Sequence, residues 1–404
     1  MSQLNPERII ELKNRSAGLD AGIVIDTLRN GSACGGLRIL PDVDLEETKL
    51  LARAMTLKFG FILNSSVGGA KSFIKIPRNC TNEKKCELIR QFATQASQII
   101  KNGVYFPHMD MNCSNEDVNL IYETLKMKMP QMGDSSYYTA LTIFSCIAVA
   151  AEYQKLNLNE LSLVISGFGN VATYLAEEIK NTGIKIIGVS NTKGAIYREN
   201  GLDINKLIEL RKEHGSNFLG YYLKNDQEFK FLSNKELIAK KCDILVPAAR
   251  PYSINRKNVS KIKARIISPA ANFAYDDYSI GYLHKKGIIS FPDFVSSCGG
   301  VYGTSLNLKG VSQNGSRKII LKYFTQAIKK LLIKSSQANK SIHELAEEMV
   351  VRNLETKNRK NGNEKYNLLN DLKILIRATI KLGPSFFTNP IYQFLERGRL
   401  SKLI

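Results

Sequence analysis

Two lysines and one aspartate in the first part of the chain have the chemistry of an acid–base site. Lys71 follows two glycines, Gly68 and Gly69, which let the backbone approach a ligand closely and hold the amine in one place. Lys58 lies upstream of it and Asp110 lies downstream. Two amines and a carboxylate that converge on a small site suit proton-coupled chemistry at a carbonyl or an imine.

The segments around these residues alternate between helical and strand patterns. Residues 45–55 have helical periodicity, 72–76 alternate as a strand, 83–100 predict another helix, and 104–106 predict a short strand. That last strand runs into the loop of Asp110, and reactive side chains are often placed on loops of this kind. We therefore expect an N-terminal α/β domain that positions the three residues.

A glycine-rich segment, Gly167-Phe168-Gly169-Asn170-Val171-Ala172, fits the fingerprint of a dinucleotide-binding turn. It follows a buried strand pattern at 161–166 and opens a helix pattern at 174–181; a second strand pattern follows at 185–190. In such a turn the first glycine permits the tight bend, the second permits close approach of the pyrophosphate, and the helix N-terminus donates amide hydrogens. The alternative is a tight strand-to-helix turn without a ligand.

Further short apolar strand patterns occur at 243–246, 264–267 and 288–291. Their alternation with helical segments predicts a doubly wound, Rossmann-type sheet. At the end of its second strand, where a carboxylate would bind the adenosine ribose, the chain has Asn191, followed by Lys193. Asn191 does not repel a 2′-phosphate and Lys193 would attract one, so NAD and NADP both remain open as cofactors.

Taken together, these motifs resemble the glutamate/leucine/phenylalanine/valine dehydrogenase family, and the resemblance runs in order from about residue 30 to 308. The matching segments are Cys34–Arg38, Met55–Lys58, Gly68–Lys71, the Asp110 loop, Gly167–Ala172, Cys242–Ala249, Pro269–Asn272 and Pro292–Val301. Eight matches in the same order are far more specific than any one of them.

The resemblance implies a role for each member of the acid–base set. Lys58 would bind the α-carboxylate of the substrate, in a pocket to which Gly36 would also contribute. Lys71 would activate water and polarise the carbonyl or imine, with a pKa lowered by burial and by neighbouring cations. Asp110 would carry protons to and from the substrate amine.

The same resemblance implies an NAD- or NADP-dependent oxidative deamination. The nicotinamide would be held near Thr139 and Asn272 and would exchange hydride with the substrate α-carbon. Water would add to the resulting iminium, ammonia would leave, and the reversible reaction would connect an L-amino acid with a 2-oxo acid. The remaining cofactor contacts would be made by Gly167, Gly169, Asn170, Val171, Asn191 and Ala248.

Two departures from the family pattern bear on the substrate. Members specific for glutamate have a lysine before the Gly-Gly-x-Arg run, where its charge pairs with the substrate side chain; here that residue is Cys34. The family serine that binds the same carboxylate falls near Thr304, which supplies no charge. Burying a carboxylate without a cation costs several kcal/mol. We therefore expect a neutral substrate side chain, unless Lys75 or Arg78 substitutes.

Other departures leave a second hypothesis open. Ser72 and Phe73 stand where small residues usually follow the catalytic lysine, one residue is added between Lys58 and Lys71, Ser297 replaces an asparagine, and Pro269 replaces a glutamate. The alternative is a catalytically weakened homologue that binds nucleotide and serves as a regulatory or structural subunit.

Length and composition set the broad frame. A chain of 404 residues, of which 44% are hydrophobic, is long enough for about two domains. We expect a substrate-binding and oligomerisation domain over 1–135, a dinucleotide domain over 136–308, and a basic helical region over 309–404. Since family members assemble through the N-terminal domain, a homo-oligomer is expected.

Charge and cysteine content exclude several classes of function. Of the net charge of +20, about +12 lies from residue 309 onward, where basic residues alternate with Leu and Ile at helical spacing. A solvated helix face is favoured there over binding of nucleic acid or another polyanion. The seven cysteines are scattered without a C-x-x-C pair, so we expect neither a metal site nor a disulfide framework. Without a signal or membrane segment, the expected location is cytoplasmic.

Overall fold

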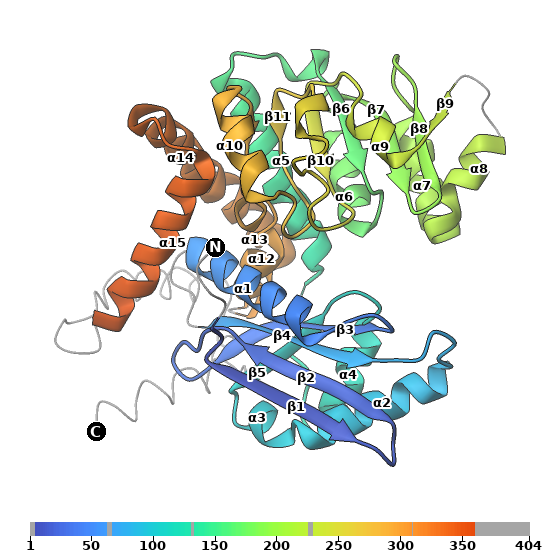
Figure 1. Ribbon diagram of the computed structural model, residues 1–404, viewed down its shortest axis with the longest axis vertical. Coiled ribbons are helices and arrows are strands. Elements are labelled where there is room, and N and C mark those ends of the chain that lie inside the picture. The colour runs from blue at the N-terminus through green and yellow to red at the C-terminus, as the bar shows by residue number, and fades with distance from the viewer. Residues whose placement is uncertain (1–4, 63–66, 131–132, 225–228, 309, 360–404) are drawn as a thin grey trace. The chain divides into compact units, whose positions relative to one another are not determined.

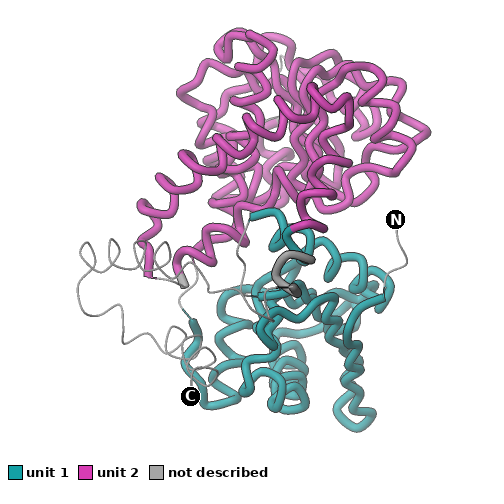
Figure 2. Tube along the Cα trace, turned by 90° about the vertical axis from the view of Figure 1, so that its left-hand side faces the viewer, with its two compact units in different colours: residues 1–131, 353–404 teal, residues 132–352 magenta. Residues whose placement is uncertain are grey.

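The chain divides into two compact units (Figure 2). The computed structural model describes residues 5–62, 67–130, 133–224, 229–308 and 310–359. The first unit comprises residues 1–131 and the chain from 353 onward, and the second comprises 132–352. The three-part division at 135 and 308 stays a prediction, and residues 360–404 of its basic region lie outside the described residues.

The first unit is built on a five-stranded sheet with the order β1-β2-β4-β3-β5. Its strands are β1 (Arg8–Asn14), β2 (Leu19–Ile25), β3 (Ala33–Leu40), β4 (Gly68–Lys75) and β5 (Tyr105–Met109). β1, β2 and β4 pair antiparallel, whereas β3 runs parallel to both β4 and β5. Gly36 of β3 is paired with His108 of β5, and Leu37 with Ser72 of β4. Lys71 and the start of the Asp110 loop therefore flank one short stretch of β3.

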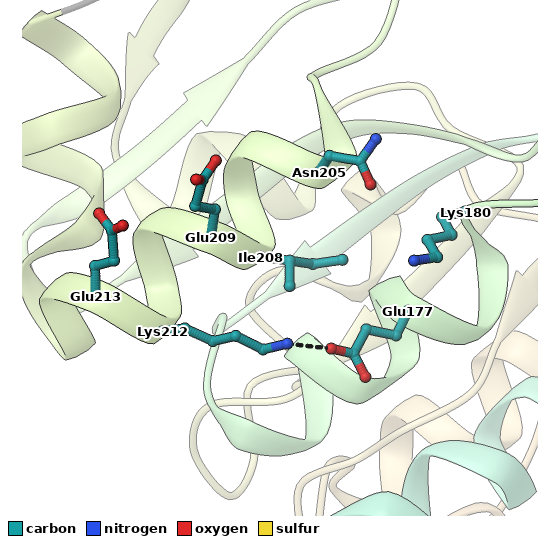
Figure 3. Close-up of a pocket in the computed structure, with 7 residues that line it drawn as sticks. All are labelled: Glu177, Lys180, Asn205, Ile208, Glu209, Lys212 and Glu213. Atoms are coloured by element: carbon teal, nitrogen blue, oxygen red, sulfur yellow. Dashed lines mark hydrogen bonds and ion pairs between the residues drawn. The ribbon is translucent and has the colours of Figure 1, made fainter.

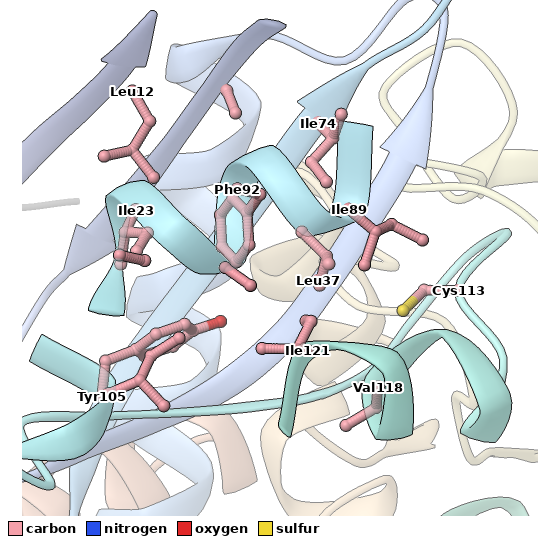
Figure 4. Close-up of a cluster of buried hydrophobic side chains, with 14 of the residues drawn as sticks. Leu12, Ile23, Leu37, Ile74, Ile89, Phe92, Tyr105, Cys113, Val118 and Ile121 are labelled. Carbon is pink, nitrogen blue, oxygen red and sulfur yellow. The ribbon is translucent and has the colours of Figure 1, made fainter. Parts of the chain in front are cut away.

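Helices cover both faces of this sheet (Figure 1). α1 (Leu45–Phe61) lies on one face, and α2 (Asn82–Gln95), α3 (Ser97–Lys101) and α4 (Asn115–Thr124) lie on the other. The side chains between the sheet and the second group form an apolar core (Figure 4), in which Ile23, Leu37, Ile74, Phe92 and Ile121 are fully buried. The single helix predicted over 83–100 is wrong, because the chain turns at Ala96 between α2 and α3.

The second unit contains a seven-stranded sheet with the order β12-β11-β10-β6-β7-β8-β9. The strands are β6 (Ser162–Ser166), β7 (Lys185–Asn191), β8 (Gly194–Tyr197), β9 (Lys230–Leu232), β10 (Ile244–Pro247), β11 (Ile266–Ile267) and β12 (Ile289–Ser290). The five from β12 to β7 are parallel, and β8 and β9 extend the edge antiparallel. The Rossmann-type sheet predicted from the apolar runs is confirmed.

Helices flank the parallel sheet and continue beyond it (Figure 1). They are α5 (Ser135–Tyr153), α6 (Asn170–Ile179), α7 (Ile204–His214), α8 (Phe218–Lys224), α9 (Asn234–Ile238), α10 (Asp277–Lys285), α11 (Asp293–Ser296), α12 (Gly299–Leu308), α13 (Gln313–Ile319), α14 (Thr325–Ala338) and α15 (Ile342–Arg359). A π-helical segment, Ile320–Phe324, joins α13 to α14. Within the described residues, none of these helices is long and apolar enough to span a membrane.

Candidate active site

Lys71 and Asp110 form an ion pair in the first unit. Lys71 Nζ lies 3.0 Å from Asp110 Oδ2, and the lysine side chain is only 6% exposed. Lys71 belongs to β4, between its neighbours β2 and β3, while Asp110 directly follows β5. At that distance a proton can pass between the amine and the carboxylate without an intervening water molecule.

A glycine on β3 lies in close contact with this pair. A Cβ atom on Gly36 would lie 2.8 Å from Asp110 Cβ, 3.1 Å from Lys71 Nζ and 2.7 Å from the main-chain oxygen of Met109. Any larger residue at position 36 would therefore intrude on the amine and the carboxylate together. The structure brings three residues of the predicted site, Gly36, Lys71 and Asp110, into direct contact.

A second close approach lies between the elements that carry Lys58 and Lys71. A Cβ atom on Gly69 would lie 2.1 Å from the main-chain nitrogen of Thr56, so the backbones of α1 and β4 nearly touch there. Lys58 and Lys71 each follow this contact by two residues along their own element. Lys58 is buried, with 8% of its surface exposed, which is unusual for a lysine.

Burial and charge have opposite effects on Asp110. Burial alone would raise its pKa, but the charges of Lys71 and Arg38, together with their hydrogen bonds, outweigh it and lower the pKa to about 2. In this arrangement the carboxyl group is ionised at neutral pH.

Arg38 is a member of this site to which the sequence analysis assigned no role. Its Nε donates a hydrogen bond to Asp110 Oδ2 at 2.8 Å, and its Nη1 donates one to Glu47 Oε1 at 2.6 Å. Glu47 lies in the first turn of α1, where its main-chain amide is capped by Asp44. Arg38 is part of the matched segment 34–38, but its partners are 72 and 9 residues away, so no local pattern reveals them.

Cys34, the candidate specificity residue, faces the same region. Burial raises the pKa of its thiol to about 12, and the positive charge of Lys71 offsets this only in part. Cys34 and Gly36 are two residues apart on β3, so they belong to the same face of the strand. Cys34 therefore presents a neutral, weakly polar group to the site and is no nucleophile at physiological pH.

The departure at Ser72 is accommodated by a buried hydrogen-bond chain. The Tyr105 hydroxyl donates to the main-chain oxygen of Gly35 at 2.9 Å, so Ser72 Oγ, 2.7 Å away, is the donor to Tyr105. Phe73 is buried against Gly22, where a Cβ atom would lie 2.7 Å from the Phe73 ring. Both residues fit their surroundings without an unpaired polar group.

In the second unit, the turn between β6 and α6 has the geometry of a dinucleotide-binding turn. Gly167 has φ +106°, and a Cβ atom there would lie 2.8 Å from the main-chain carbon of Ala248, so the protein itself requires this glycine. Gly169 differs, because a Cβ atom on it would meet nothing within 4 Å. The open space at Gly169 is available to a ligand.

The first turn of α6 offers hydrogen-bond donors toward that space. Gly169 is its N-cap residue and makes no side-chain cap, so the first amides, beginning at Asn170 and Val171, have no capping side chain. Arg211 of α7 donates from Nε to the main-chain oxygen of Phe168 at 3.1 Å and from Nη2 to Asn170 Oδ1 at 3.4 Å. Nothing in the local sequence pattern distinguishes Arg211 from other basic residues, so this contact with the turn could not be predicted.

The other predicted cofactor residues have defined surroundings. Asn191, at the end of β7, donates to the main-chain oxygen of Ser216 and accepts from the amide of Lys193. Thr139 Oγ1, on α5, accepts from the amide of Gly300, which joins α5 to α12. Asn272 is half-buried in the loop after β11. Thr304 Oγ1 on α12 is buried and has no hydrogen-bond partner among the described residues, as expected of a hydroxyl reserved for a ligand.

Two further departures from the family pattern are also satisfied locally. Ser297 is buried and donates from Oγ to the main-chain oxygen of Asp293 at 2.7 Å. The main-chain oxygen of Pro269 accepts from Ser296 Oγ at 2.6 Å. Neither substitution leaves a strained or unpaired group near the nucleotide turn.

Other features of the described residues carry no competing site. A surface pocket of about 470 Å³ lies between α6 and α7 (Figure 3), where Lys212 pairs with Glu177 at 2.7 Å. Its lining is mostly charged and contains none of the predicted site residues. Across the described parts of the chain, no three His, Cys, Asp or Glu side chains are grouped as metal ligands.

Comparison with known proteins assigns both units to one family. Residues 133–365 match the Glutamate/Leucine/Phenylalanine/Valine dehydrogenase family, and residues 6–127 match the Glu/Leu/Phe/Val dehydrogenase dimerisation domain. The chain belongs to this family. It is an amino-acid dehydrogenase, an oxidoreductase that uses NAD or NADP, and the resemblance inferred from the eight collinear segments is confirmed.

Individual relatives of this dehydrogenase are glutamate dehydrogenases. It is 34% identical over 287 residues to the NAD-specific glutamate dehydrogenase of Staphylococcus aureus, covering 67% of each chain. It is 28% identical over 355 residues to the NADP-specific glutamate dehydrogenase of Saccharolobus shibatae, covering 81% of this chain and 82% of that one. The fold matches the hetero-hexameric glutamate dehydrogenase of Thermus thermophilus with a TM-score of 0.77 and 20% identity, over 89% and 91% of the two chains.

Proposed function

We propose that this dehydrogenase catalyses the reversible oxidative deamination of an L-amino acid with a neutral side chain to a 2-oxo acid and ammonia. The observation that carries the proposal is the buried Lys71–Asp110 pair beside Gly36, with Cys34 as the neutral neighbour of the amine. Acid–base groups in contact, beside a backbone position that only glycine can occupy, suit proton transfer to and from a small substrate.

In this scheme each residue handles one part of the substrate. Lys58 binds the α-carboxylate through its ammonium group. NAD or NADP, when bound, would supply the acceptor for the hydride of the substrate α-carbon. Lys71, in its neutral form, takes a proton from the water that attacks the resulting iminium carbon. Asp110 receives that proton through the 3.0 Å contact and passes it to the departing amine. One amino acid, one water and one oxidised cofactor give one 2-oxo acid, one ammonium ion, one reduced cofactor and one proton.

The preference for a neutral side chain rests on the charges at the site. A glutamate side chain would bring a second carboxylate that needs its own cation, because an unpaired buried carboxylate costs several kcal/mol. Cys34, whose thiol stays neutral, supplies none, and Thr304, which the family pattern assigns to the same carboxylate, carries no charge. The named relatives act on glutamate, so this position is where we expect the chain to differ from them.

A substrate panel tests the proposal. Purified protein is incubated with neutral and acidic amino acids, or with 2-oxo acids and ammonia, and absorbance of the reduced nicotinamide is followed with each cofactor. We expect turnover with a neutral amino acid and a far lower kcat/KM with glutamate. Faster turnover of glutamate would refute the side-chain preference.

The alternative of a catalytically weakened homologue is tested by the same protein. Its motivating departures, Ser72, Phe73, Ser297 and Pro269, are all accommodated in the structure. Calorimetric binding of NAD or NADP without turnover of any substrate would favour that alternative and refute the proposed catalysis. Loss of turnover in Lys71→Ala, with cofactor binding retained, is the result expected of an active enzyme.

We also propose that the protein assembles as a homo-oligomer through its first unit. The match of residues 6–127 to a dimerisation domain supports this. Sedimentation velocity should give a mass that is a multiple of the 45.2 kDa chain. A monomer at micromolar concentration would contradict the proposal.

A further inference from the structure

One oxygen atom of Asp110 receives both of the hydrogen bonds that the structure shows for its carboxylate. Lys71 Nζ and Arg38 Nε reach the same atom, Oδ2, at 3.0 and 2.8 Å. Within the described residues no hydrogen bond reaches Oδ1. The carboxylate is therefore tied at one oxygen, while the other remains available to a substrate.

The two cations at Oδ2 are held differently. Lys71 is a flexible chain with a single charged end, and in the proposed reaction it must turn to the attacking water. Arg38 has a planar guanidinium fixed at two points, by Asp110 at Nε and by Glu47 at Nη1. The Arg38 side chain is 9% exposed, and Glu47 is anchored in the first turn of α1. Of these two cations, Arg38 is the one whose guanidinium the structure also anchors at a second carboxylate, that of Glu47.

We propose that Arg38, anchored by Glu47, is the positioning residue of the active site: it holds Oδ2 of Asp110 so that Oδ1 is presented for proton exchange with the substrate amine. This inference rests on the proposed deamination and adds to it two residues without an assigned role. Arg38 touches no substrate in this scheme and acts through Asp110 alone.

Arg38 also sets the charge state of the carboxylate. Asp110 is partly buried, with 18% of its side chain exposed; burial alone would raise its pKa, and Lys71 and Arg38 lower it together. The thiol of Cys113 also faces Asp110, but burial raises its pKa to about 12, so it contributes no charge at neutral pH. When Lys71 is in its neutral form, Arg38 is the cation that keeps Asp110 ionised.

Kinetics of Arg38→Gln, Arg38→Lys and Glu47→Gln test this assignment. Arg38→Gln should lower kcat by about 100-fold with little change in KM, because a misplaced catalytic group costs on that order. The acidic limb of its pH profile should move upward by about 1–3 pH units, as expected when a carboxylate loses an adjacent arginine. Compared with Arg38→Gln, Arg38→Lys should have a pH profile closer to that of the wild type, because it keeps the positive charge. It should recover less of kcat, because a lysine cannot bind Asp110 and Glu47 at two separate points. Glu47→Gln should show a smaller loss of kcat in the same direction.

Lys85→Gln is the matched control. It removes the cation from another buried carboxylate of the first unit, Asp117, whose Oδ2 lies 2.6 Å from Lys85 Nζ. This variant should keep the wild-type kcat and pH profile. The assignment would be overturned if Lys85→Gln lost as much kcat as Arg38→Gln. It would also be overturned if Arg38→Gln kept the kcat and the acidic limb of the pH profile of the wild type.

A spectroscopic measurement separates this inference from the proposed function. Infrared difference spectra of protein labelled with 13C at aspartate carboxyls, assigned with Asp110→Asn, report protonation of Asp110 without turnover. Asp110 should protonate at a higher pH in Arg38→Gln than in the wild type. If the wild type turns over no substrate, the proposed function fails. If Asp110 titrates identically in both proteins, the role of Arg38 fails.

Discussion

At Asp110, folding changes the proton affinity of one carboxyl group. Its ordinary pKa is 3.8, and the charges of Lys71 and Arg38 lower it to about 2 against the effect of burial. Folding thus favours the ionised form. The associated stability is fully present above pH 4 and is lost as the pH falls toward 2, since protonation removes the attraction to both cations.

Asp110→Asn should therefore destabilise the protein in a pH-dependent way. Near pH 7 the free energy of unfolding should fall by about 2 kcal/mol, the equivalent of the pKa difference. Toward pH 3 the gap between variant and wild type should narrow, because the wild-type carboxyl is increasingly protonated and its cations lose their partner as well. Urea unfolding at pH 7, 4 and 3 measures this. A gap that stays constant over that range would show that Asp110 does not titrate as described.

Cys34→Lys should shift the substrate preference toward glutamate. The new ammonium would pair with a substrate carboxylate, and a partly buried pair of this kind can supply the 1.4 kcal/mol that corresponds to a tenfold change. We expect the ratio of kcat/KM for glutamate to that for the best neutral amino acid to rise at least about tenfold. Cys34→Ser, similar in size and uncharged, serves as control and should leave the ratio within a fewfold of the wild type. An unchanged ratio in Cys34→Lys would place the side-chain pocket elsewhere.

Among the elements, those with a strong local pattern could be predicted from the sequence. The parallel strands β6, β7 and β10 are short apolar runs because they are buried on both faces, and such runs are visible without an alignment. The edge strand β1 was not predicted, because most of its residues are exposed and its alternation of apolar and polar residues is short. The break between α2 and α3 was also not predicted, because Ala96 lies in an otherwise helical sequence pattern.

The candidate site shows the same limit. Lys71, Gly36 and Asp110 stand in motifs that a family resemblance marks, and the structure brings them together. Arg38 and Glu47 were missed because their interactions depend on how β3, β5 and α1 pack. A side chain that acts through another side chain is hard to recognise from the local sequence. Glycines and lysines in short motifs are easier to recognise.

The hydrogen-bond chain from Ser72 through Tyr105 to Gly35 links three strands, β4, β5 and β3, beneath the site. Ser72→Ala should cost about 1 kcal/mol of unfolding free energy, since Tyr105 keeps its bond to Gly35. Tyr105→Phe should cost more, about 1–3 kcal/mol, because it leaves two buried polar groups unpaired. The double variant measures their coupling by a double-mutant cycle in urea. Strictly additive losses would mean that the chain is not a cooperative unit.

For the whole molecule, the two units have separate tasks. The first holds the acid–base pair of Lys71 and Asp110, and the second holds the turn at Gly167 and Gly169. Substitutions in one unit should therefore change catalysis and cofactor binding separately. Gly167 and Gly169 can be compared directly by substitution, because the fold requires glycine at position 167 and leaves space for a side chain at position 169.

Gly169→Ala should weaken cofactor binding without weakening the fold. Its added Cβ meets no protein atom within 4 Å, and its φ of −101° is accessible to alanine, so thermal stability should not fall. The same Cβ would occupy the space in which a pyrophosphate approaches the backbone, so the Kd for NAD or NADP should rise at least about tenfold by calorimetry. Gly281→Ala, equally free of contacts on α10, is the matched control and should bind cofactor as the wild type does.

Gly167→Ala should instead lower stability, because its φ of +106° and its contact with Ala248 leave no room for a side chain. If Gly169→Ala bound cofactor normally, the turn between β6 and α6 would be a structural bend and the nucleotide would bind elsewhere.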